Sequence, residues 1–163
     1  MTQTRTLTDP MKRWATFALL VFSLNFAWEM MQMKWFASMQ GLPLWRTTLV
    51  CARATLGDLL ITAIAFGIAA LVVKSTMWPT GPRVVIAAIT FVGVGITITA
   101  AYEIFALAKG MWRYDQTMPS LFGIGAIPLL QWLLLPVVEV LLFRYMAHGK
   151  ASGWRKGGAP AAK

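Results

Sequence analysis

The chain has few charged residues, one cysteine and one histidine. Charged residues make up 13% of its 163 residues, well below the quarter or so that is usual in soluble domains. The lone cysteine, Cys51, excludes an intrachain disulfide, and with the lone histidine, His148, it leaves no Cys/His spacing for a zinc site. We therefore predict no metal site, and the sequence identifies no cofactor.

Apolar residues, in contrast, are abundant. The hydrophobic set accounts for 58% of the chain, and the mean hydropathy is +0.62. A soluble globule of this length cannot bury so much apolar surface. The net charge is +9, but the basic residues lie between the apolar runs and at the termini rather than on one face. A soluble enzyme and a nucleic-acid partner are therefore excluded, and an integral membrane protein with the lipid bilayer as partner is indicated.

Four apolar runs are each long enough to cross the hydrocarbon core as a helix, which takes about 20 residues. The first run lacks a small-residue cleavage pattern after it, so we interpret it as a retained helix and not as a signal peptide. We predict an all-α fold, a polytopic bundle of four transmembrane helices within residues 1–148, followed by a basic, flexible C-terminal tail at 149–163. The predicted spans are about 14–35, 52–73, 84–108 and 119–144.

The basic residues are unevenly divided between the two sides of these spans. Ten of the fifteen Lys and Arg fall in the N-terminal segment, the connection between the second and third spans, and the C-terminal segment, whereas five fall on the other side. Cytoplasmic segments carry the excess of Lys and Arg, so we expect both termini to be cytoplasmic (N-in/C-in). The expected location is a bacterial-type inner (plasma) membrane.

Four of the six acidic residues lie inside the apolar runs. A charge near the bilayer centre costs at least about 2.5–3.5 kcal/mol on insertion scales, so such residues usually face the bundle interior. In this topology Glu29, Asp58 and Glu103 lie in the outer half of the membrane. Glu139 lies in the inner half close to Arg144, and we expect it to be separate, reaching the interface or pairing with that arginine.

The residues near the first three carboxyl groups suggest one polar pocket. Asn25, Glu29 and Gln32 are spaced four and three apart, so they share a helix face. Carboxyl groups that lose water tend toward their neutral form and can act as general acids and bases. Glu29, Asp58 and Glu103 are therefore our candidate catalytic residues. The candidate ligand-binding residues are Asn25, Gln32, Tyr102, Trp112, Tyr114, Asp115 and Gln131.

Two other interpretations of these polar residues are open. Carboxylate oxygens can hold a divalent cation. The same groups can also be structural glue, with Arg53 neutralising Asp58 or Glu29 and with amides hydrogen-bonding across helices.

The residues Glu29-x-x-Gln32 followed by Asp58 resemble the Glu-x-x-Gln and later Asp of VanZ-like membrane proteins. The resemblance covers a small part of the chain, and no residue role is carried over from that family.

Two classes of function fit these features. The first is a small membrane protein, catalytic or not, whose outer-half pocket binds or acts on a lipid, an isoprenoid or another apolar molecule. The second is a non-catalytic accessory or assembly subunit of a larger membrane complex, with a membrane-protein partner or a second copy of itself. The first predicts that the three carboxyl groups converge on a cavity, and the second that each has its own partner. A proton or ion pathway ranks third, because four helices enclose little room for a conduit.

Overall fold

The computed structural model describes residues 8–148. They contain four long helices, α1 (Thr8–Gln32), α2 (Leu44–Val73), α3 (Val84–Ala108) and α4 (Ala126–His148). Each is long and apolar enough to cross a membrane. The all-α prediction is confirmed, and the four helices support a multi-pass membrane protein. The predicted C-terminal tail at 149–163 lies outside the described residues.

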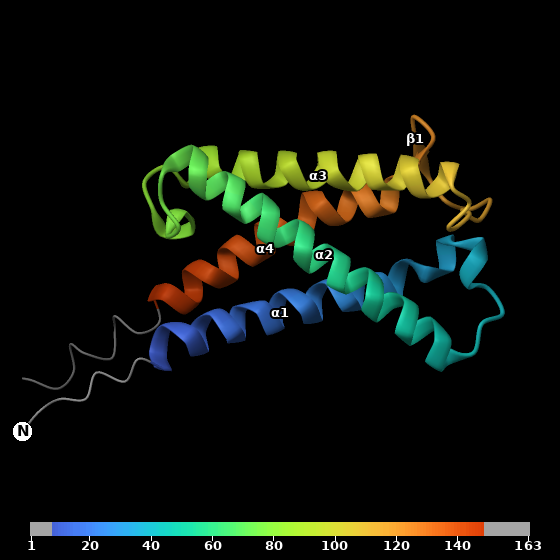
Figure 1. Ribbon diagram of the computed structural model, residues 1–163, viewed down its shortest axis with the longest axis horizontal. Coiled ribbons are helices and arrows are strands. Elements are labelled where there is room, and N and C mark those ends of the chain that lie inside the picture. The colour runs from blue at the N-terminus through green and yellow to red at the C-terminus, as the bar shows by residue number, and fades with distance from the viewer. Residues whose placement is uncertain (1–7, 149–163) are drawn as a thin grey trace, which may run out of the picture.

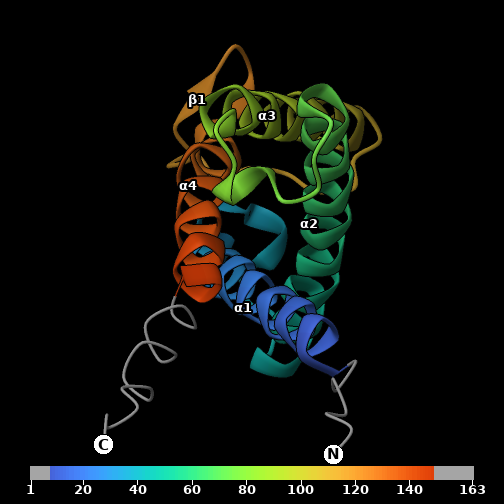
Figure 2. The same cartoon turned by 90° about the vertical axis from the view of Figure 1, so that its left-hand side faces the viewer.

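The helices form a ring in sequence order when viewed along the bundle (Figure 2). Neighbours in the ring are in contact, so that α1 packs on α2, α2 on α3, α3 on α4, and α4 on α1. Helices α1 and α3 are therefore diagonal to each other, as are α2 and α4. Side chains on the inner faces of all four helices point toward a common axis.

The connections are grouped at the two ends of the bundle. The start of α1, the α2–α3 connection with its 3-10 turn η3 (Trp78–Thr80), and the end of α4 lie at one end, termed here the η3 end (Figure 1). The α1–α2 connection, with η1 (Met33–Trp35) and η2 (Ala37–Met39), lies at the opposite end with the α3–α4 connection. We term this the hairpin end, after the two short strands in the second connection.

Helix α2 is longer than a membrane span requires. Its 30 residues measure about 45 Å at 1.5 Å per residue, against roughly 30 Å of hydrocarbon. The helix starts at Leu44, directly after Pro43, and not at the predicted residue 52. It runs obliquely, beside α3 at the η3 end and away from it toward the hairpin end (Figure 1). The backbones of α2 and α3 are therefore farther apart at the hairpin end than at the η3 end (Figure 1).

The fourth helix starts later than predicted. Residues 119–125, expected to be helical, contain β1 (Ser120–Leu121) and β2 (Ile124–Gly125), which pair antiparallel. The two residues of the turn between them have positive φ angles, +52° at Phe122 and +80° at Gly123, which a right-handed helix cannot contain. Helix α4 therefore begins at Ala126.

The apolar core lies toward the η3 end. One cluster joins α2, η3 and α3, and a second joins α1 and α4. Ala65 and Ala69 of α2 are fully buried, and such small side chains let neighbouring helix backbones approach closely. The first cluster consists of Ala65, Ala69, Val73, Trp78, Ala87 and Phe91, and the second of Phe17, Val21 and Phe143. Further buried side chains, both apolar and polar, lie outside these two clusters.

Candidate functional site

A chain of hydrogen bonds in the bundle interior runs from α4 to α1, back to α4, and on to α2. Asn25 Nδ2 donates to Glu139 Oε1 at 3.1 Å and to the Val21 carbonyl at 2.9 Å. Gln131 Nε2 donates to Asn25 Oδ1 at 2.8 Å and to Asp58 Oδ2 at 3.1 Å. Asn25, Gln131 and Glu139 are at most 3% exposed. Two carboxyl groups on different helices are thus joined by two amides, and this set is termed the amide bridge.

Helix periodicity explains why these side chains face inward. Gln131 and Glu139 lie eight residues apart on α4, which brings them to one face. Asp58 lies three residues after Thr55, on the inner face of α2 that also carries the buried Thr62. The rule that places i, i+3 and i+4 residues on one face therefore positions both ends of the bridge.

Glu29 is held mainly within its own helix. Gln32 Nε2 donates to Glu29 Oε1 at 2.6 Å, and Trp28 Nε1 donates to Gln32 Oε1 at 3.2 Å. The carboxyl group of Glu29 also lies within electrostatic range of Asp58 and Glu103. Trp28, which the sequence argument did not select, therefore positions the amide that holds Glu29.

Glu103 on α3 is held by the α3–α4 connection. Tyr114 donates its hydroxyl hydrogen to Glu103 Oε2, and Trp112 Nε1 donates to the same oxygen at 3.2 Å. The Gly125 N–H donates in turn to the Tyr114 hydroxyl at 2.9 Å. A Cβ atom at Gly125 would lie 3.0 Å from Tyr114 Cζ, a tight contact that would require the phenol to shift slightly, so glycine suits this close approach. Tyr114 therefore links a buried carboxyl group to the base of the hairpin.

The four carboxyl groups inside the bundle lie close enough to interact electrostatically. Asp58 lies within electrostatic range of both Glu103 and Glu139. Each of the four accepts a hydrogen bond from at least one neutral donor, which is an amide, an indole or a phenol. In that part of the chain, no group of three or more His, Cys, Asp and Glu residues could hold a metal ion. The carboxyl groups thus lie near one another, and each accepts a hydrogen bond from a neutral donor.

Two of the selected residues do not join this cluster. The Tyr102 side chain is 48% exposed, and its ring packs against Phe105 and Trp112. Asp115 accepts hydrogen bonds from the Thr117 N–H (2.9 Å) and hydroxyl (2.7 Å), and from Gln40 Nε2 (2.7 Å). These bonds, the Thr117 N–H first, hold the pKa of Asp115 below its ordinary value. Asp115 thus ties the two connections of the hairpin end together.

The expectation that Glu139 is separate was wrong. Asn25 donates to it, so Glu139 belongs to the amide bridge. Arg144 donates to the Pro79 carbonyl at 3.1 Å. The spacing of Gln131 and Glu139 contained the signal, because two polar residues eight apart in an apolar helix share a face.

The amide bridge contains the least satisfied polar group of the site. Glu139 Oε2 is buried and has no hydrogen-bond partner among the described residues, and Trp132 Nε1 is in the same condition. Both residues line a narrow crevice that has no room for a water molecule. Pro136, which also lines it, has no N–H to donate to the Trp132 carbonyl. The crevice is lined by Asn25, Gln131, Trp132, Leu135, Pro136 and Glu139.

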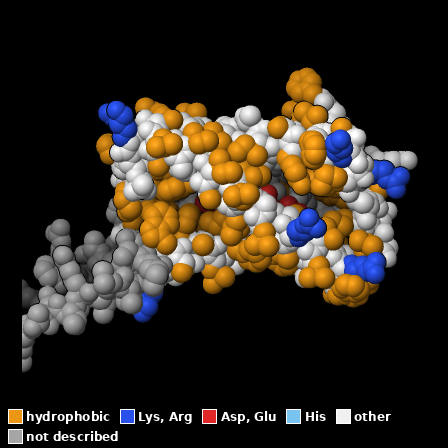
Figure 3. Space-filling model, viewed as in Figure 1, with side chains coloured by type: hydrophobic (Ala, Val, Ile, Leu, Met, Phe, Trp, Pro, Cys, Tyr) orange, Lys and Arg blue, Asp and Glu red, His pale blue; other side chains and the backbone are white. Residues whose placement is uncertain are grey.

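The interior is visible from one side of the bundle. Figure 3 shows acidic side chains at the bottom of a narrow hollow in a face that is otherwise covered mainly by apolar side chains. A basic side chain lies beside the opening (Figure 3). The hollow lies where α2 and α3 diverge, as Figure 1 shows from the same direction. The interior acidic side chains are thus not fully covered on this side (Figure 3), although Glu103 and Glu139 are buried.

Comparisons of the chain with family models, with curated proteins and with solved structures find no match. The resemblance of Glu29-x-x-Gln32 and Asp58 to VanZ-like proteins stays a likeness of a few residues. The case for a function therefore depends on the geometry of the bundle.

Tyr114→Phe is expected to lower the free energy of unfolding by roughly 1–3 kcal/mol, because Glu103 and the Gly125 N–H lose a partner. Burial and the hydrogen bond to Glu103 raise the pKa of Tyr114 above its ordinary value of about 10. A raised pKa means that the folded state favours the neutral phenol. The contribution of this phenol to the free energy of unfolding is therefore complete below pH 10 and is lost as the pH rises further. The difference in free energy of unfolding between wild type and Tyr114→Phe should therefore be constant from pH 7 to 9 and become smaller above pH 10.

The measurement is denaturant unfolding in detergent at a series of pH values. Tyr145→Phe, which alters a 77% exposed side chain, is the control and should leave stability unchanged at pH 7. A stability difference for Tyr114→Phe that is absent at pH 7, or that stays constant into strong alkali, would contradict the bonding described for this phenol.

Proposed function

We propose that this multi-pass membrane protein binds the polar head of a lipid, an isoprenoid or a similar apolar molecule at the carboxyl groups between its helices. The observation that carries the proposal is the hollow between α2 and α3, with acidic side chains at its bottom and apolar side chains around it (Figure 3). A molecule with an apolar chain and a polar head matches that distribution, because each part meets its own kind of surface.

The hydrogen-bonding pattern supports a head group that donates. The cluster contains Glu29, Asp58, Glu103 and Glu139, all of which accept from neutral donors. One carboxyl oxygen, Glu139 Oε2, is buried with no partner among the described residues. An ammonium or hydroxyl head brings N–H or O–H donors to such acceptors, whereas a phosphate or carboxylate head brings more acceptors. We therefore expect an amine or alcohol to bind better than an acid of the same chain length.

The oblique course of α2 supports entry from the bilayer. The helix leaves α3 toward the hairpin end, so a chain lying among the lipids can present its head to the hollow without crossing an aqueous compartment (Figure 1). Side chains on the outside of α2, such as Leu56 and Leu60, are at least 60% exposed and apolar. The apolar part of the ligand would remain among such side chains and the surrounding acyl chains.

We infer that both termini are cytoplasmic and that the hairpin end is on the outer side of a bacterial-type inner membrane. The support is the excess of Lys and Arg in the segments assigned to the inner side. In the structure, the start of α1, the α2–α3 connection and the end of α4 lie together at the η3 end (Figure 1). An arrangement with both termini cytoplasmic requires these three segments to lie at the same end of the bundle.

An accessory subunit is the second candidate function. The observation that favours it is that Glu29 and Glu103 each have their own donors, Gln32 for the first and Tyr114 for the second. Locally satisfied polar groups are typical of structural hydrogen bonding between helices. In that case the carboxyl groups stabilise the bundle and bind no ligand.

Glu29→Gln distinguishes the two functions. The amide has the size of the carboxyl group but lacks its charge and one acceptor, so we expect the bundle to fold while losing the head group. The measurement is saturable retention of dodecylamine by the purified protein in detergent, read by mass spectrometry, with dodecanol and dodecanoic acid as comparators. We expect wild type to retain the amine best and Glu29→Gln to retain at least about tenfold less, the equivalent of 1.4 kcal/mol.

Asp115→Asn is the matched control, because it makes the same chemical change in the loop, away from the cluster. Its retention of dodecylamine should equal that of wild type. Equal retention by Glu29→Gln and wild type, or a lower melting temperature as the sole effect of Glu29→Gln, would support the subunit function instead.

A further inference from the structure

The tip of the hairpin combines an unfavourable backbone conformation with an exposed aromatic ring. Phe122 has φ +52° and is followed by Gly123 at φ +80°. Two residues with positive φ between paired strands form a type I′ turn, which asparagine or aspartate followed by glycine adopts readily. A bulky side chain at the first position is strained. The Phe122 side chain is nevertheless 96% exposed, so no contact within the described protein offsets that strain.

The hairpin is fixed in direction by bonds at its base. The Ala126 N–H donates to the Pro119 carbonyl at 2.7 Å, and the Gly125 N–H donates to the Tyr114 hydroxyl at 2.9 Å. Ser120 pairs with Gly125 across the two strands. The position of the tip relative to the bundle is therefore set by the same phenol that binds Glu103.

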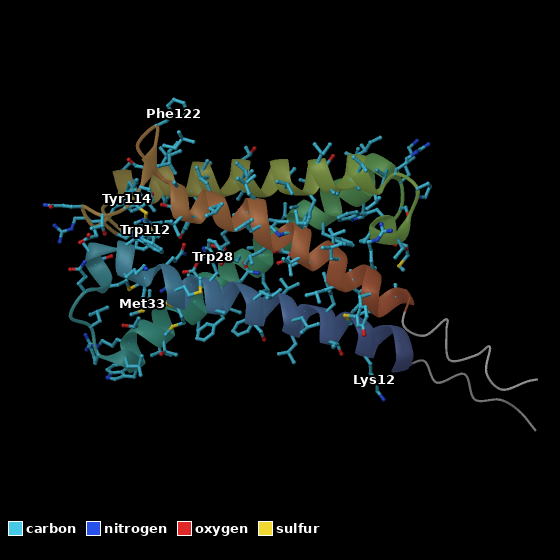
Figure 4. All side chains as sticks on the ribbon, turned by 180° about the vertical axis from the view of Figure 1, so that it is seen from behind. Lys12, Trp28, Met33, Trp112, Tyr114 and Phe122 are labelled. Atoms are coloured by element: carbon cyan, nitrogen blue, oxygen red, sulfur yellow. The ribbon has the colours of Figure 1, made fainter. Side chains whose placement is uncertain are left out.

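The tip points sideways and not along the bundle axis. Figures 1 and 4 show the hairpin projecting laterally at the level of the last turns of α3, with Phe122 at its far end. Figure 2 shows the same projection beyond the outline of the four helices. Helix α4, a candidate span, begins immediately after the hairpin. The tip therefore lies at the border of the spanning region and faces what surrounds the bundle.

We infer that Phe122 anchors the hairpin end in the bilayer, with its ring inserted at the boundary between headgroups and acyl chains. Leu121, beside it, is 53% exposed, so the tip presents two adjacent apolar side chains. Exposed apolar side chains, including Ile104 and Leu130, also lie on α3 and α4, and apolar side chains cover the surface next to the tip (Figure 3). That continuity assigns the tip to the same lipid that covers those faces. Insertion of the ring removes its apolar surface from water and so offsets the strained turn.

The depth of residue 122 tests this inference. A nitroxide label on Phe122→Cys in phosphatidylcholine vesicles should be reached readily by oxygen and poorly by a water-soluble nickel chelate. The native Cys51 is 1% exposed and is replaced by alanine in all samples. Gln116→Cys, exposed in the same connection, is the aqueous reference, and Leu60→Cys, 63% exposed on α2, is the lipid reference. We expect the nickel chelate to reach residue 122 several-fold less than residue 116.

Two outcomes would overturn the inference. Equal access of the nickel chelate to residues 122 and 116 would place the tip in water. Low access of both oxygen and nickel at residue 122 would show that protein covers it, which would indicate a partner or a second copy.

Phe122→Asn provides a second test that keeps the turn. Asparagine suits the first position of a type I′ turn, so the variant should fold and keep its melting temperature in detergent. A nitroxide at Leu121→Cys should then become several-fold more accessible to the nickel chelate when Phe122→Asn is added. An unchanged depth at residue 121 would show that the ring does not hold the hairpin in the membrane.

Discussion

Replacing Gly95 with alanine is expected to destabilise the bundle more than the addition of a methyl group at any other position. A Cβ atom at this position would overlap the six-membered ring of Trp132, which lies directly against the α3 backbone. Trp132 is 3% exposed, and its ring also packs against Phe91. The indole is flat and enclosed, so it cannot turn aside as the end of a flexible side chain would. Helices α3 and α4 must separate to admit the methyl group.

Overpacking of a core usually costs 1–3 kcal/mol and occasionally more, and we expect about 3 kcal/mol here because a rigid ring is displaced. Gly93→Ala is the matched control, since it lies on the same helix and a Cβ atom there would meet nothing within 4 Å. That change should be neutral or stabilise the helix by up to about 1 kcal/mol. Denaturant unfolding in detergent measures both variants. Equal stabilities would contradict the contact of Trp132 with the α3 backbone.

The sequence was sufficient to predict the number and class of the helices. The first and third spans were predicted at 14–35 and 84–108, and the candidate spans of the structure are Trp14–Trp35 and Val84–Ala108. Helix α1 itself begins earlier, at Thr8, and ends at Gln32, whereas the ends of α3 coincide with the apolar run between Arg83 and Lys109. Hydropathy carries the information here because a spanning helix must be apolar along its whole length.

Hydropathy failed where an apolar segment is not helical. The hairpin contains Leu121, Phe122 and Ile124, so composition alone does not distinguish it from the helix that follows. Its turn depends on the φ angles of Phe122 and Gly123, and phenylalanine is an unusual residue for that conformation. The sequence signal for a turn was therefore weak, and the start of the fourth span was placed too early.

The inward orientation of several polar residues, such as Asn25 and Gln131, could also be predicted, but their partners could not. Helix spacing grouped Asn25 with Glu29 and Gln32, yet in the structure Asn25 bonds to Glu139 and Gln131 of α4. Those bonds require the ring order of the helices and the approach of α4 to α1, which are properties of tertiary packing. The sequence likewise gave no reason to connect Glu103 with Gly125, a contact that Tyr114 makes through its hydroxyl group.

Gln131→Leu is expected to have the largest effect on the polar interior. Gln131 Nε2 is the donor to both Asn25 Oδ1 and Asp58 Oδ2, so an apolar side chain of similar size leaves two acceptors without that donor. A single hydrogen bond between membrane helices contributes about 0.6 kcal/mol on average. Leaving a buried polar group unsatisfied costs about 1–3 kcal/mol. We therefore expect a loss of roughly 2–3 kcal/mol in the free energy of unfolding.

Leu130→Ala is the control for changes on the same helix, because this side chain is 39% exposed on the outer surface and should contribute less than 1 kcal/mol. The double variant Asn25→Leu/Gln131→Leu tests whether the two amides act together. If they do, the double variant will lose less free energy of unfolding than the sum of the losses in the two single variants. Gln131→Leu already leaves Asn25 Oδ1 without its donor, so replacing Asn25 as well removes an acceptor that is no longer bonded to Gln131. Additive losses, or an unchanged stability for Gln131→Leu, would mean that the amide bridge does not hold α1, α2 and α4 together. The carboxyl groups at its two ends would then be positioned by helix packing alone.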